Sequence, residues 1–232
     1  MNGRIIAIIP ARGGSKGISW KNLRKLNGKG LLYYAIKEAA KSKWIDRIVV
    51  STDSPRIARE AKRHGAEVPF LRPKDMATDR SPVRDAIIHA LDYFKTQEGA
   101  EYDIFVLLQP TSPLRKARHI DMAIEKLLRK GCDSVISVSP VREHPVRMLE
   151  LDKDKIKRFV LKSKRGLRRQ DLPPVYKVDG SVYVRGVKSF RKSGKLITKD
   201  TRAIVLGWDE SVDIDDEIDL ALAKILMRTG RR

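Results

Sequence analysis

The sequence predicts an α/β protein whose mainly parallel sheet is covered by helices on both faces. Short runs rich in Ile and Val alternate along the chain with longer stretches whose apolar residues recur every three or four positions. Such alternation is typical of parallel sheets, in which a helix crosses back over the sheet after each strand. Ligands of these sheets bind at the carboxyl ends of the strands, so the loops that follow the strands are the candidate sites.

Each element is predicted from its own pattern. Short apolar runs predict strands over 4–9, 47–51, 104–108 and 134–139. Stretches with helical periodicity predict helices over 31–42, 55–64, 83–96 and 117–130. Later in the chain we predict a strand over 177–184, with a bend at Asp179-Gly180, and a closing helix over 218–227.

Length and charge limit the class of protein. The chain has 232 residues, enough for one domain with an appendage, and its single cysteine, Cys132, is predicted to pack as a small apolar side chain. No run approaches the roughly 20 apolar residues that span a bilayer, so we expect a soluble, cytoplasmic protein with no membrane partner. The net charge of +20 would attract polyanions or suit a heat-adapted surface. Because the cations are mixed with acids and no nucleic-acid-binding motif is present, we expect no specific nucleic acid partner.

The loop after the first predicted strand carries the strongest functional signal. It reads Ala-Arg-Gly-Gly-Ser-Lys-Gly over 11–17, and its glycines let the backbone bend tightly while Arg12, Lys16 and Lys21 gather positive charge around the bend. The spacing fits neither a Walker loop nor a dinucleotide-binding fingerprint. This concentration of cations at a strand end predicts a site for a triphosphate whose charge is neutralised as it is cleaved. A solvated basic loop is the alternative.

Two later loops and one helix start carry weaker signals. Asp53, just before Pro55, is predicted to cap the next helix, with an approach to the ligand as the alternative. The loop over 109–115 is stiffened by two prolines and presents an amide, two hydroxyls and a guanidinium at the sheet edge. Ser81 precedes Pro82, and we leave open whether it caps the helix or contacts a ligand there.

The carboxyl-terminal third contains a pair of acids and a basic excursion. In an extended segment, Asp213 and Asp215 share one side while Val212 and Ile214 pack on the other. Two such carboxylates suit Mg²⁺, which takes its other ligands from water and phosphate oxygens. The segment 143–176 breaks the alternating pattern with many cations, so we predict that it leaves the sheet to cover the active site or to join subunits, a solvated arm being the alternative.

In this order, the motifs resemble those of the acylneuraminate cytidylyltransferases, the CMP-sialic acid or CMP-nonulosonic acid synthetases. The resemblance rests on ARGGSKG at 11–17 with Lys21-Asn22, STD at 51–53, QPTSPLR at 109–115, RRQDLPP at 168–174, GSVY at 180–183 and SVDID at 211–215. It implies a Rossmann-like nucleotide-diphospho-sugar transferase fold, a single domain over 1–232 in which 143–176 protrudes and reaches the partner of a homodimer. The implied reaction joins CTP and a nonulosonic acid, a nine-carbon 2-keto sugar acid, to give the CMP-sugar and pyrophosphate with Mg²⁺ as cofactor.

The resemblance also implies roles for individual residues. The catalytic residues would be Arg12, Lys16, Lys21 and Asp215. The nucleotide would contact Ala11, Arg12, Gly14, Lys16, Lys21, Asn22, Arg72 and Ser81. The acid sugar would contact Gln109, Arg147, Arg169, Asp179 and Tyr183, and the metal would bind Asp213 and Asp215.

One departure from the family pattern concerns the acceptor. Sialic acid enzymes generally carry Asn-Gly where this chain has Asp179-Gly180, and an acid in place of an amide loses a donor toward a hydroxyl or N-acetyl group. This disfavours N-acetylneuraminate and leaves legionaminate, pseudaminate or a deaminated nonulosonate open. The alternative function is another sugar nucleotidyltransferase, with a different nucleotide or an eight-carbon ulosonate acceptor.

Overall fold

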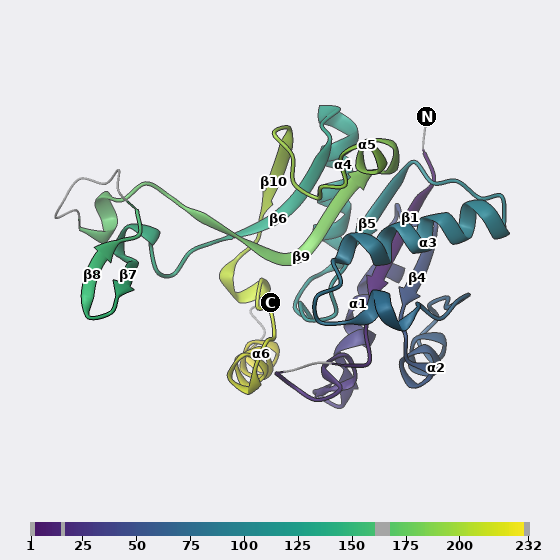
Figure 1. Cartoon of the computed structure of the whole chain (residues 1–232), viewed down its shortest axis with the longest axis horizontal. Helices are drawn as coiled ribbons and strands as arrows, with labels where there is room; N and C mark the ends of the chain where they lie inside the picture. Colours follow the sequence, from purple (N-terminus) through teal and green to yellow (C-terminus); the bar gives the residue numbers. More distant parts are fainter. Residues whose placement is uncertain (1–2, 15–16, 161–167, 230–232) are drawn as a thin grey trace.

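The central sheet confirms the predicted fold class. The computed structural model describes residues 3–14, 17–160 and 168–229. Six strands of this described part form one sheet in the order β10-β6-β9-β5-β1-β4 (Figure 1). Their bounds are β1 (Ile5–Pro10), β4 (Arg47–Ser51), β5 (Ile104–Leu107), β6 (Ser134–Pro140), β9 (Tyr176–Gly186) and β10 (Thr201–Val205). The pairs β1·β4, β1·β5 and β6·β10 are parallel, and β9 runs antiparallel to both of its neighbours.

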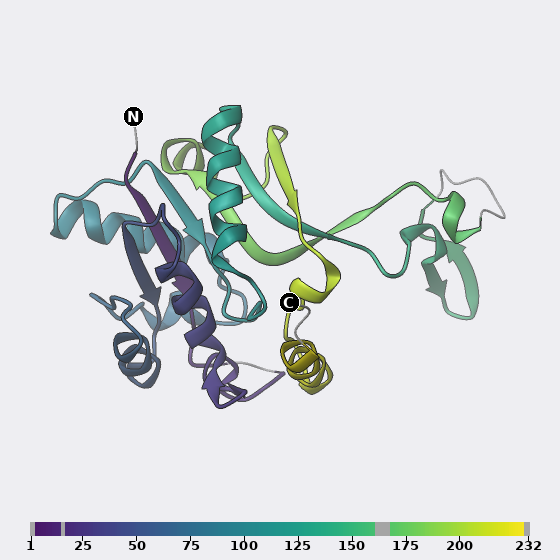
Figure 2. The same ribbon diagram turned by 180° about the vertical axis from the view of Figure 1, so that it is seen from behind.

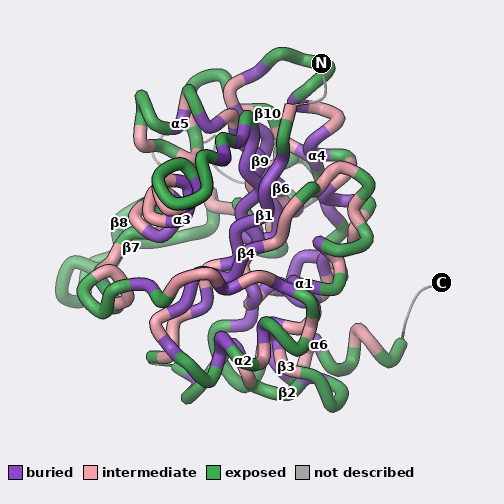
Figure 3. The backbone as a smooth tube through the Cα atoms, turned by 90° about the vertical axis from the view of Figure 1, so that its right-hand side faces the viewer, coloured by how far each residue is buried: buried purple, intermediate pink, exposed green. Residues whose placement is uncertain are grey.

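Helices cover both faces of this sheet, as Figures 1 and 2 show from opposite sides. The helices α1 (Leu31–Ala40), α2 (Pro55–Arg63) and α4 (Ala117–Lys130) pack in one apolar cluster, while α3 (Val83–Gln97) and α5 (Val187–Ser193) pack in another. Strand β1 contributes alternate residues to the two, with Ile5, Ala7 and Ile9 in the first cluster and Ile6 and Ile8 in the second. A strand buried on both sides needs the uninterrupted apolar run that the sequence has there (Figure 3).

A third apolar cluster joins the two ends of the chain. Here α6 (Glu217–Thr229) packs against the short hairpin of β2 (Lys25–Leu26) and β3 (Lys29–Gly30). Val212 and Ile214 lie in this cluster together with Ile18, so the acidic segment and the loop after β1 share one core. The backbone of Gly17 lies against that of Asp215, so closely that a Cβ at Gly17 would be 2.6 Å from the carbonyl oxygen of Asp215.

The basic excursion projects from the sheet on the extended ends of β6 and β9 (Figures 1 and 2). It carries the antiparallel hairpin of β7 (Leu149–Asp152) and β8 (Lys155–Arg158). Both strands are exposed along their whole length, including large apolar side chains such as Leu151 and Ile156.

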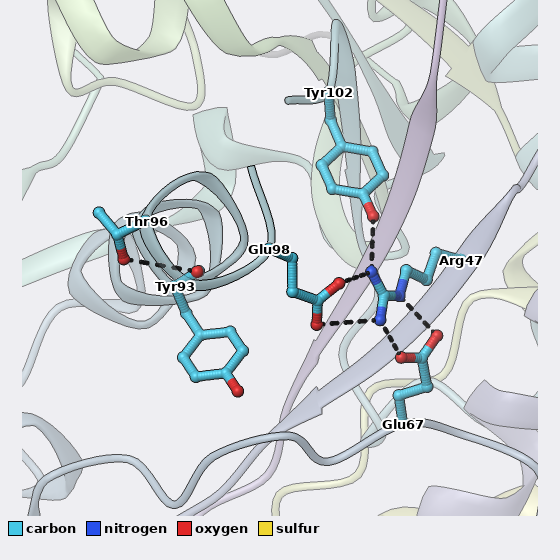
Figure 4. Close-up of polar contacts among 6 residues, drawn as sticks. All are labelled: Arg47, Glu67, Tyr93, Thr96, Glu98 and Tyr102. Carbon is cyan, nitrogen blue, oxygen red and sulfur yellow. Dashed lines mark hydrogen bonds and ion pairs between the residues drawn. The ribbon is translucent and has the colours of Figure 1, made fainter. Parts of the chain in front are cut away.

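A charged cluster fastens the edge strand β4 (Figure 4). The guanidinium of Arg47 donates to both carboxylate oxygens of Glu67, to the carboxylate of Glu98 and to the hydroxyl of Tyr102. Glu67 belongs to a segment that bridges β4, and Glu98 follows the end of α3. Arg47 also lies 4.3 Å from the ring centre of Phe94, so one side chain ties the sheet edge to α3.

The predicted elements are present, with ends within two residues of those expected. The elements that were not predicted include α5, which has only seven residues, and the edge strand β10, which begins with Thr201 and Arg202 and is only partly buried. The strands of the two short hairpins, β2·β3 and β7·β8, were not predicted either. The predicted bend at Asp179-Gly180 does not interrupt the strand. The chain continues there as one strand, β9, and its pairing with β6 shifts register between Ile136 and Val138. Cys132 is buried, as predicted. In the described part of the chain, no helix has the length and apolar character needed to span a membrane.

Candidate active site

A cavity of about 630 Å³ opens at the carboxyl ends of β1 and β5. The loop after β1, the segment before α3, the loop after β5 and the acidic segment before α6 all contribute to its wall. Eight residues predicted for the site line it: Arg12, Lys21, Asn22, Arg72, Ser81, Gln109, Asp213 and Asp215. Ligands of parallel sheets are expected at this edge, and the predicted residues gather around one cavity there.

The cationic loop is held in place by polar contacts from its own surroundings. Asn22 donates its amide to the carbonyl of Arg12 over 2.9 Å, and the Arg12 guanidinium lies 2.6 Å from Asp79. Asp53 accepts a hydrogen bond from the backbone N–H of Gly13 at 2.8 Å. The prediction that Asp53 caps the next helix is therefore wrong.

The cap of α2 is the next residue, Ser54, whose hydroxyl accepts from the N–H of Ile57. Asp53 precedes Ser54 by one residue. Its carboxylate reaches the glycine loop after β1, where it binds the N–H of Gly13. Asp and Ser are both common helix caps. Here Ser54 caps α2, and Asp53 holds the glycine loop.

The acidic pair faces the cavity from the opposite wall. Lys21 donates its ammonium to Oδ1 of Asp215 and to the carbonyl of Ile214, both at 2.9 Å. Burial raises the pKa of the Asp213 carboxyl, and the neighbouring Asp215 acts in the same direction. Oδ1 of Asp213 is buried and has no hydrogen-bond partner among the described residues. A backbone bond from Ile214 to the carbonyl of Thr111 fixes this segment to the loop after β5.

The segment 72–83 forms another part of the cavity wall and includes Arg72 and Ser81. Arg72 is buried, its backbone N–H donates to Thr52, and burial lowers the pKa of its guanidinium. The Ser81 hydroxyl donates to the carbonyl of Asp75 and accepts from the N–H of Thr78. Ser81 does not cap α3, because the cap position is occupied by Pro82, which forms no side-chain cap. The capping alternative for Ser81 is excluded, while the residue does line the cavity.

Gln109, Asp213 and the backbone of Gly180 converge on one point of the wall. Gly180 has φ = +77°, and a Cβ there would lie 2.6 Å from Oε1 of Gln109 and 3.4 Å from Oδ2 of Asp213. Asp179 is buried behind them and accepts hydrogen bonds from the Ser137 hydroxyl and the backbone N–H of Ser181.

Tyr183 lies further back in the same wall. It packs against the cluster formed with α3 and α5, and burial raises its pKa, with Asp179 and Asp213 acting in the same direction. Neither Asp179 nor Tyr183, both predicted to contact the acid sugar, is part of the cavity lining.

Three further predicted residues that the structure describes, Ala11, Gly14 and Arg147, do not line the cavity. Arg147 is exposed in the 3₁₀ turn η3 (Pro145–Arg147) of the excursion. Ala11 is buried and continues the β1·β4 pairing, and Gly14 is exposed in the loop. Lys16 and the side chain of Arg169 lie outside the described part of the chain.

The sequence missed the residues that close the cavity next to Arg72. Met76, Ala77, Thr78 and Asp79 line it, and Asp79 pairs with Arg12. These residues have neither the periodicity of an element nor a motif. The sequence offered one signal for these residues, which is that the segment around Ala77 lies between two prolines.

A second cavity of about 370 Å³ borders Asp213 from the other side. It lies between the root of the excursion and α6, where Arg142 stacks over the ring of Trp208 and Lys177 adds a cation. Asp213 thus separates a polar, cationic cavity from one with an aromatic wall.

Comparisons with known proteins agree with this architecture. A family model described as cytidylyltransferase matches residues 6–203. CMP-N,N'-diacetyllegionaminic acid synthase of Legionella pneumophila is 39% identical over 231 residues, 98% of each chain. Pseudaminic acid cytidylyltransferase of Campylobacter jejuni is 30% identical over 226 residues, 97% of each chain. A solved CMP:2-keto-3-deoxy-manno-octonic acid synthetase complexed with CTP has the same fold, with a TM-score of 0.73 over 97% of this chain and 99% of that chain at 15% identity. The chain belongs to the cytidylyltransferase family and is a nucleotidyltransferase.

Proposed function

We propose that this protein joins CTP and a nonulosonic acid to give the CMP-sugar and pyrophosphate. The observation that carries the proposal is the 630 Å³ cavity in which the cations of the loop after β1 face the acidic pair. Relatives that match almost the whole chain are named for CMP-legionaminic and pseudaminic acid synthesis, which supports this acceptor class.

The geometry supports an in-line transfer at the α-phosphorus. The anomeric oxygen of the acceptor forms a bond to this phosphorus, the bond to the β-phosphoryl oxygen breaks, and the acceptor proton is lost to solvent or a carboxylate. Arg12 and Lys21 would neutralise the departing pyrophosphate, with Lys16 as a third cation. Asn22, Arg72 and Ser81 also line the cavity and would hold the nucleoside.

The acidic pair fits a magnesium ion. Both carboxylates line the cavity, and Oδ1 of Asp213 is buried without a partner among the described residues. With two protein carboxylates, the remaining ligands would be water and phosphate oxygens, as Mg²⁺ prefers. When bound by Asp213 and Asp215, the ion would supply positive charge to the phosphate oxygens.

The acceptor side of the site is argued from Gln109 and from the residues behind it. Gln109 lies next to Asp213 and can donate to a sugar hydroxyl, while the buried carboxylate of Asp179 only accepts when ionised. We propose that this wall favours legionaminate, pseudaminate or a deaminated nonulosonate over N-acetylneuraminate. The second cavity also borders Asp213, and we propose that it receives the tail of the acceptor.

We also propose a homodimer in which the excursion contacts the other subunit. Large apolar side chains are exposed along it: Met148, Leu149, Leu151, Ile156, Phe159, Tyr176 and Val178. Such a concentration on one protruding segment is typical of a protein interface. The same contact would carry Arg147 and Arg169 toward the acid sugar bound in the other subunit.

Two experiments test the proposals. The protein is incubated with Mg²⁺, each of the four ribonucleoside triphosphates and a panel of nonulosonic and eight-carbon ulosonic acids, with mass analysis of the sugar nucleotide. Product with CTP and a nonulosonate is expected; product from another nucleotide, or only from an eight-carbon acid, would replace the proposal by its alternative.

The dimer is tested by mixing two variants, Asp215→Asn and Arg169→Ala, after dissociation and reassociation. If the excursion serves the other subunit, mixed dimers contain one intact site and the mixture regains about a quarter of wild-type activity. A monomeric mass in light scattering, or no recovery on mixing, would contradict the proposal.

A further inference from the structure

We propose that Arg115 is a positioning residue that holds the loop of Gln109 against Gly180 and so sets where the acceptor sugar binds. This inference rests on the proposed function. Arg115 ends the loop after β5 and is only 2% exposed, so its guanidinium lies in the core behind the cavity wall. It does not line the cavity and therefore acts through other residues.

A single nitrogen of Arg115 bridges the two segments that form the acceptor side. Its Nη1 donates to the carbonyl of Gln109 over 3.1 Å and to the carbonyl of Ser181 over 2.8 Å. Gln109 and Gly180, the neighbour of Ser181, are the residues whose side chain and backbone meet at the cavity wall. Arg115 thus ties the loop to β9 beyond the point where the backbone pairing of β5 with β9 ends, at Leu107 and Tyr183.

There is little free space where the Gln109 side chain meets the backbone of Gly180. A Cβ at Gly180 would overlap Oε1 of Gln109 at 2.6 Å, so the amide already sits against bare backbone. A movement of the loop by a few tenths of an ångström would change the direction of the Gln109 amide next to Asp213. Displacements of about 1 Å at such positions can cost on the order of a hundredfold in rate.

Charge explains why an arginine occupies this buried position. Burial lowers the pKa of Arg115 to about 10, opposed by Glu38, Asp179 and Asp213, so the guanidinium stays protonated at neutral pH. Asp179 is itself 2% exposed, and its Oδ2 has no partner among the described residues. A cation at Arg115 offsets the charge of this carboxylate from within the core.

Arg185, on β9, offers a matched control. It is 1% exposed and, like Arg115, has its pKa lowered by burial. Its guanidinium bonds to Ser193 and to the carbonyl of Asp133, at the end of β9 remote from the Gln109 loop. Loss of Arg185 therefore removes a buried arginine without touching the acceptor wall.

The test compares Arg115→Lys, Arg115→Met and Arg185→Met in steady-state kinetics with CTP and the nonulosonate turned over by the wild type. Arg115→Lys is the milder change, because it keeps the charge but lacks the planar guanidinium. We expect the KM for the acceptor to rise about tenfold in Arg115→Lys and further in Arg115→Met, with the KM for CTP within about threefold of wild type. Arg185→Met should lower Tm and leave both KM values unchanged.

A double-mutant cycle checks that Arg115 acts through Gln109. Adding Arg115→Lys to Gln109→Ala should raise the acceptor KM by less than about twofold, because the amide it positions is already absent. Folded sites are counted by calorimetric titration with CTP, so misfolding is not mistaken for weak acceptor binding.

Two outcomes would overturn the inference, and they are distinguishable. An unchanged acceptor KM in both Arg115 variants, alongside a turning-over wild type, refutes the positioning role alone. No turnover of any acid sugar by the wild type refutes the proposed function and, with it, the acceptor that the positioning role requires.

Discussion

The Lys21 ammonium donates to Oδ1 of Asp215 over 2.9 Å, although the two residues are 194 positions apart. Lys21 begins the 3₁₀ turn η1 (Lys21–Leu23) after the glycine loop, and Asp215 precedes α6. The apolar cluster shared by Ile18 and Ile214 holds the two segments together beneath this pair. One ion pair therefore marks the point where the phosphate-binding and metal-binding halves of the proposed site meet.

Replacing Asp215 by Asn should lower kcat by about a hundredfold or more, because the change removes a metal-binding charge but little volume. Pyrophosphate release is measured over a series of Mg²⁺ concentrations. The control is Asp216→Asn, since Asp216 only accepts from the N–H groups of Ile218 and Asp219 at the start of α6. That variant should lose stability and keep its activity; wild-type turnover in Asp215→Asn would remove Asp215 from the metal-binding role.

Replacing Gly180 by Ala should lower kcat/KM for the acceptor by about ten- to a hundredfold, because the new Cβ would displace the Gln109 amide. Gly131→Ala is the matched control. Gly131 also has a positive φ, +59°, but nothing lies within 4 Å of its Cβ position. Both variants should lose about 1 kcal/mol of stability from backbone strain, whereas only Gly180→Ala should lose activity. Equal kinetics in the two would show that Gly180 matters for conformation alone.

Replacing Arg47 by Met should destabilise the fold by about 2 kcal/mol, because Glu67 and Glu98 would face each other without their shared cation. For a chain of this size, Tm should fall by about 4–8 °C in differential scanning calorimetry. Arg63→Met provides the comparison, since Arg63 forms an exposed pair with Glu60 on one helix and should change Tm by about 1 °C or less. Similar shifts in both variants would mean that the cluster of Figure 4 contributes no more than a surface pair.

Stability should decrease as the pH falls below about 7. Burial lowers the pKa of His119 and of His89 in the folded state, so the unfolded chain binds their protons more readily. By linkage, the free energy of unfolding falls as the pH drops through the ordinary histidine value of 6.5 toward the lower folded values. Urea titrations at several pH values measure this slope, and His119→Gln should make it shallower. An unchanged slope in that variant would exclude a contribution from His119.

A further loss of stability is expected at more acidic pH from Glu210. Its pKa is lowered in the folded state because hydrogen bonds from Lys116 and Arg118 and the nearby His119 outweigh the opposing effect of burial. A carboxylate of this kind stabilises the fold above its ordinary pKa of 4.5 and ceases to do so as the pH falls through the lower folded value. Glu210→Gln should remove this acid limb of the stability profile.

Much of the fold followed from local patterns. The alternation of apolar strands and amphipathic helices predicted the sheet. A strand that is buried on both faces must be apolar throughout, whereas a helix that covers the sheet needs apolar residues only on the side that faces it. The exceptions include α5 and β10, which are short or half exposed, and the strands of the two small hairpins, which have two or four residues each. Their patterns are correspondingly weak. The same logic predicted which loops would line a common cavity, since polar loops after parallel strands meet at one edge of the sheet.

The roles of individual polar residues could not be predicted in this way. Asp53 and Ser54 carried the same local capping signal, and only the distance to Gly13 decided which one holds the glycine loop. Asp79 belongs to no sequence motif, and only the structure shows that it pairs with Arg12.

The sequence by itself determined the fold class, the cationic loop, the acidic pair and the edge of the sheet where they lie, because each is encoded by residues close together in the chain. Only the tertiary structure decided that Lys21 meets Asp215, that Gly180 bears on Gln109 and that Arg115 is buried behind them. These contacts join segments far apart in the chain, and their geometry follows from the packing of the three apolar clusters as a whole.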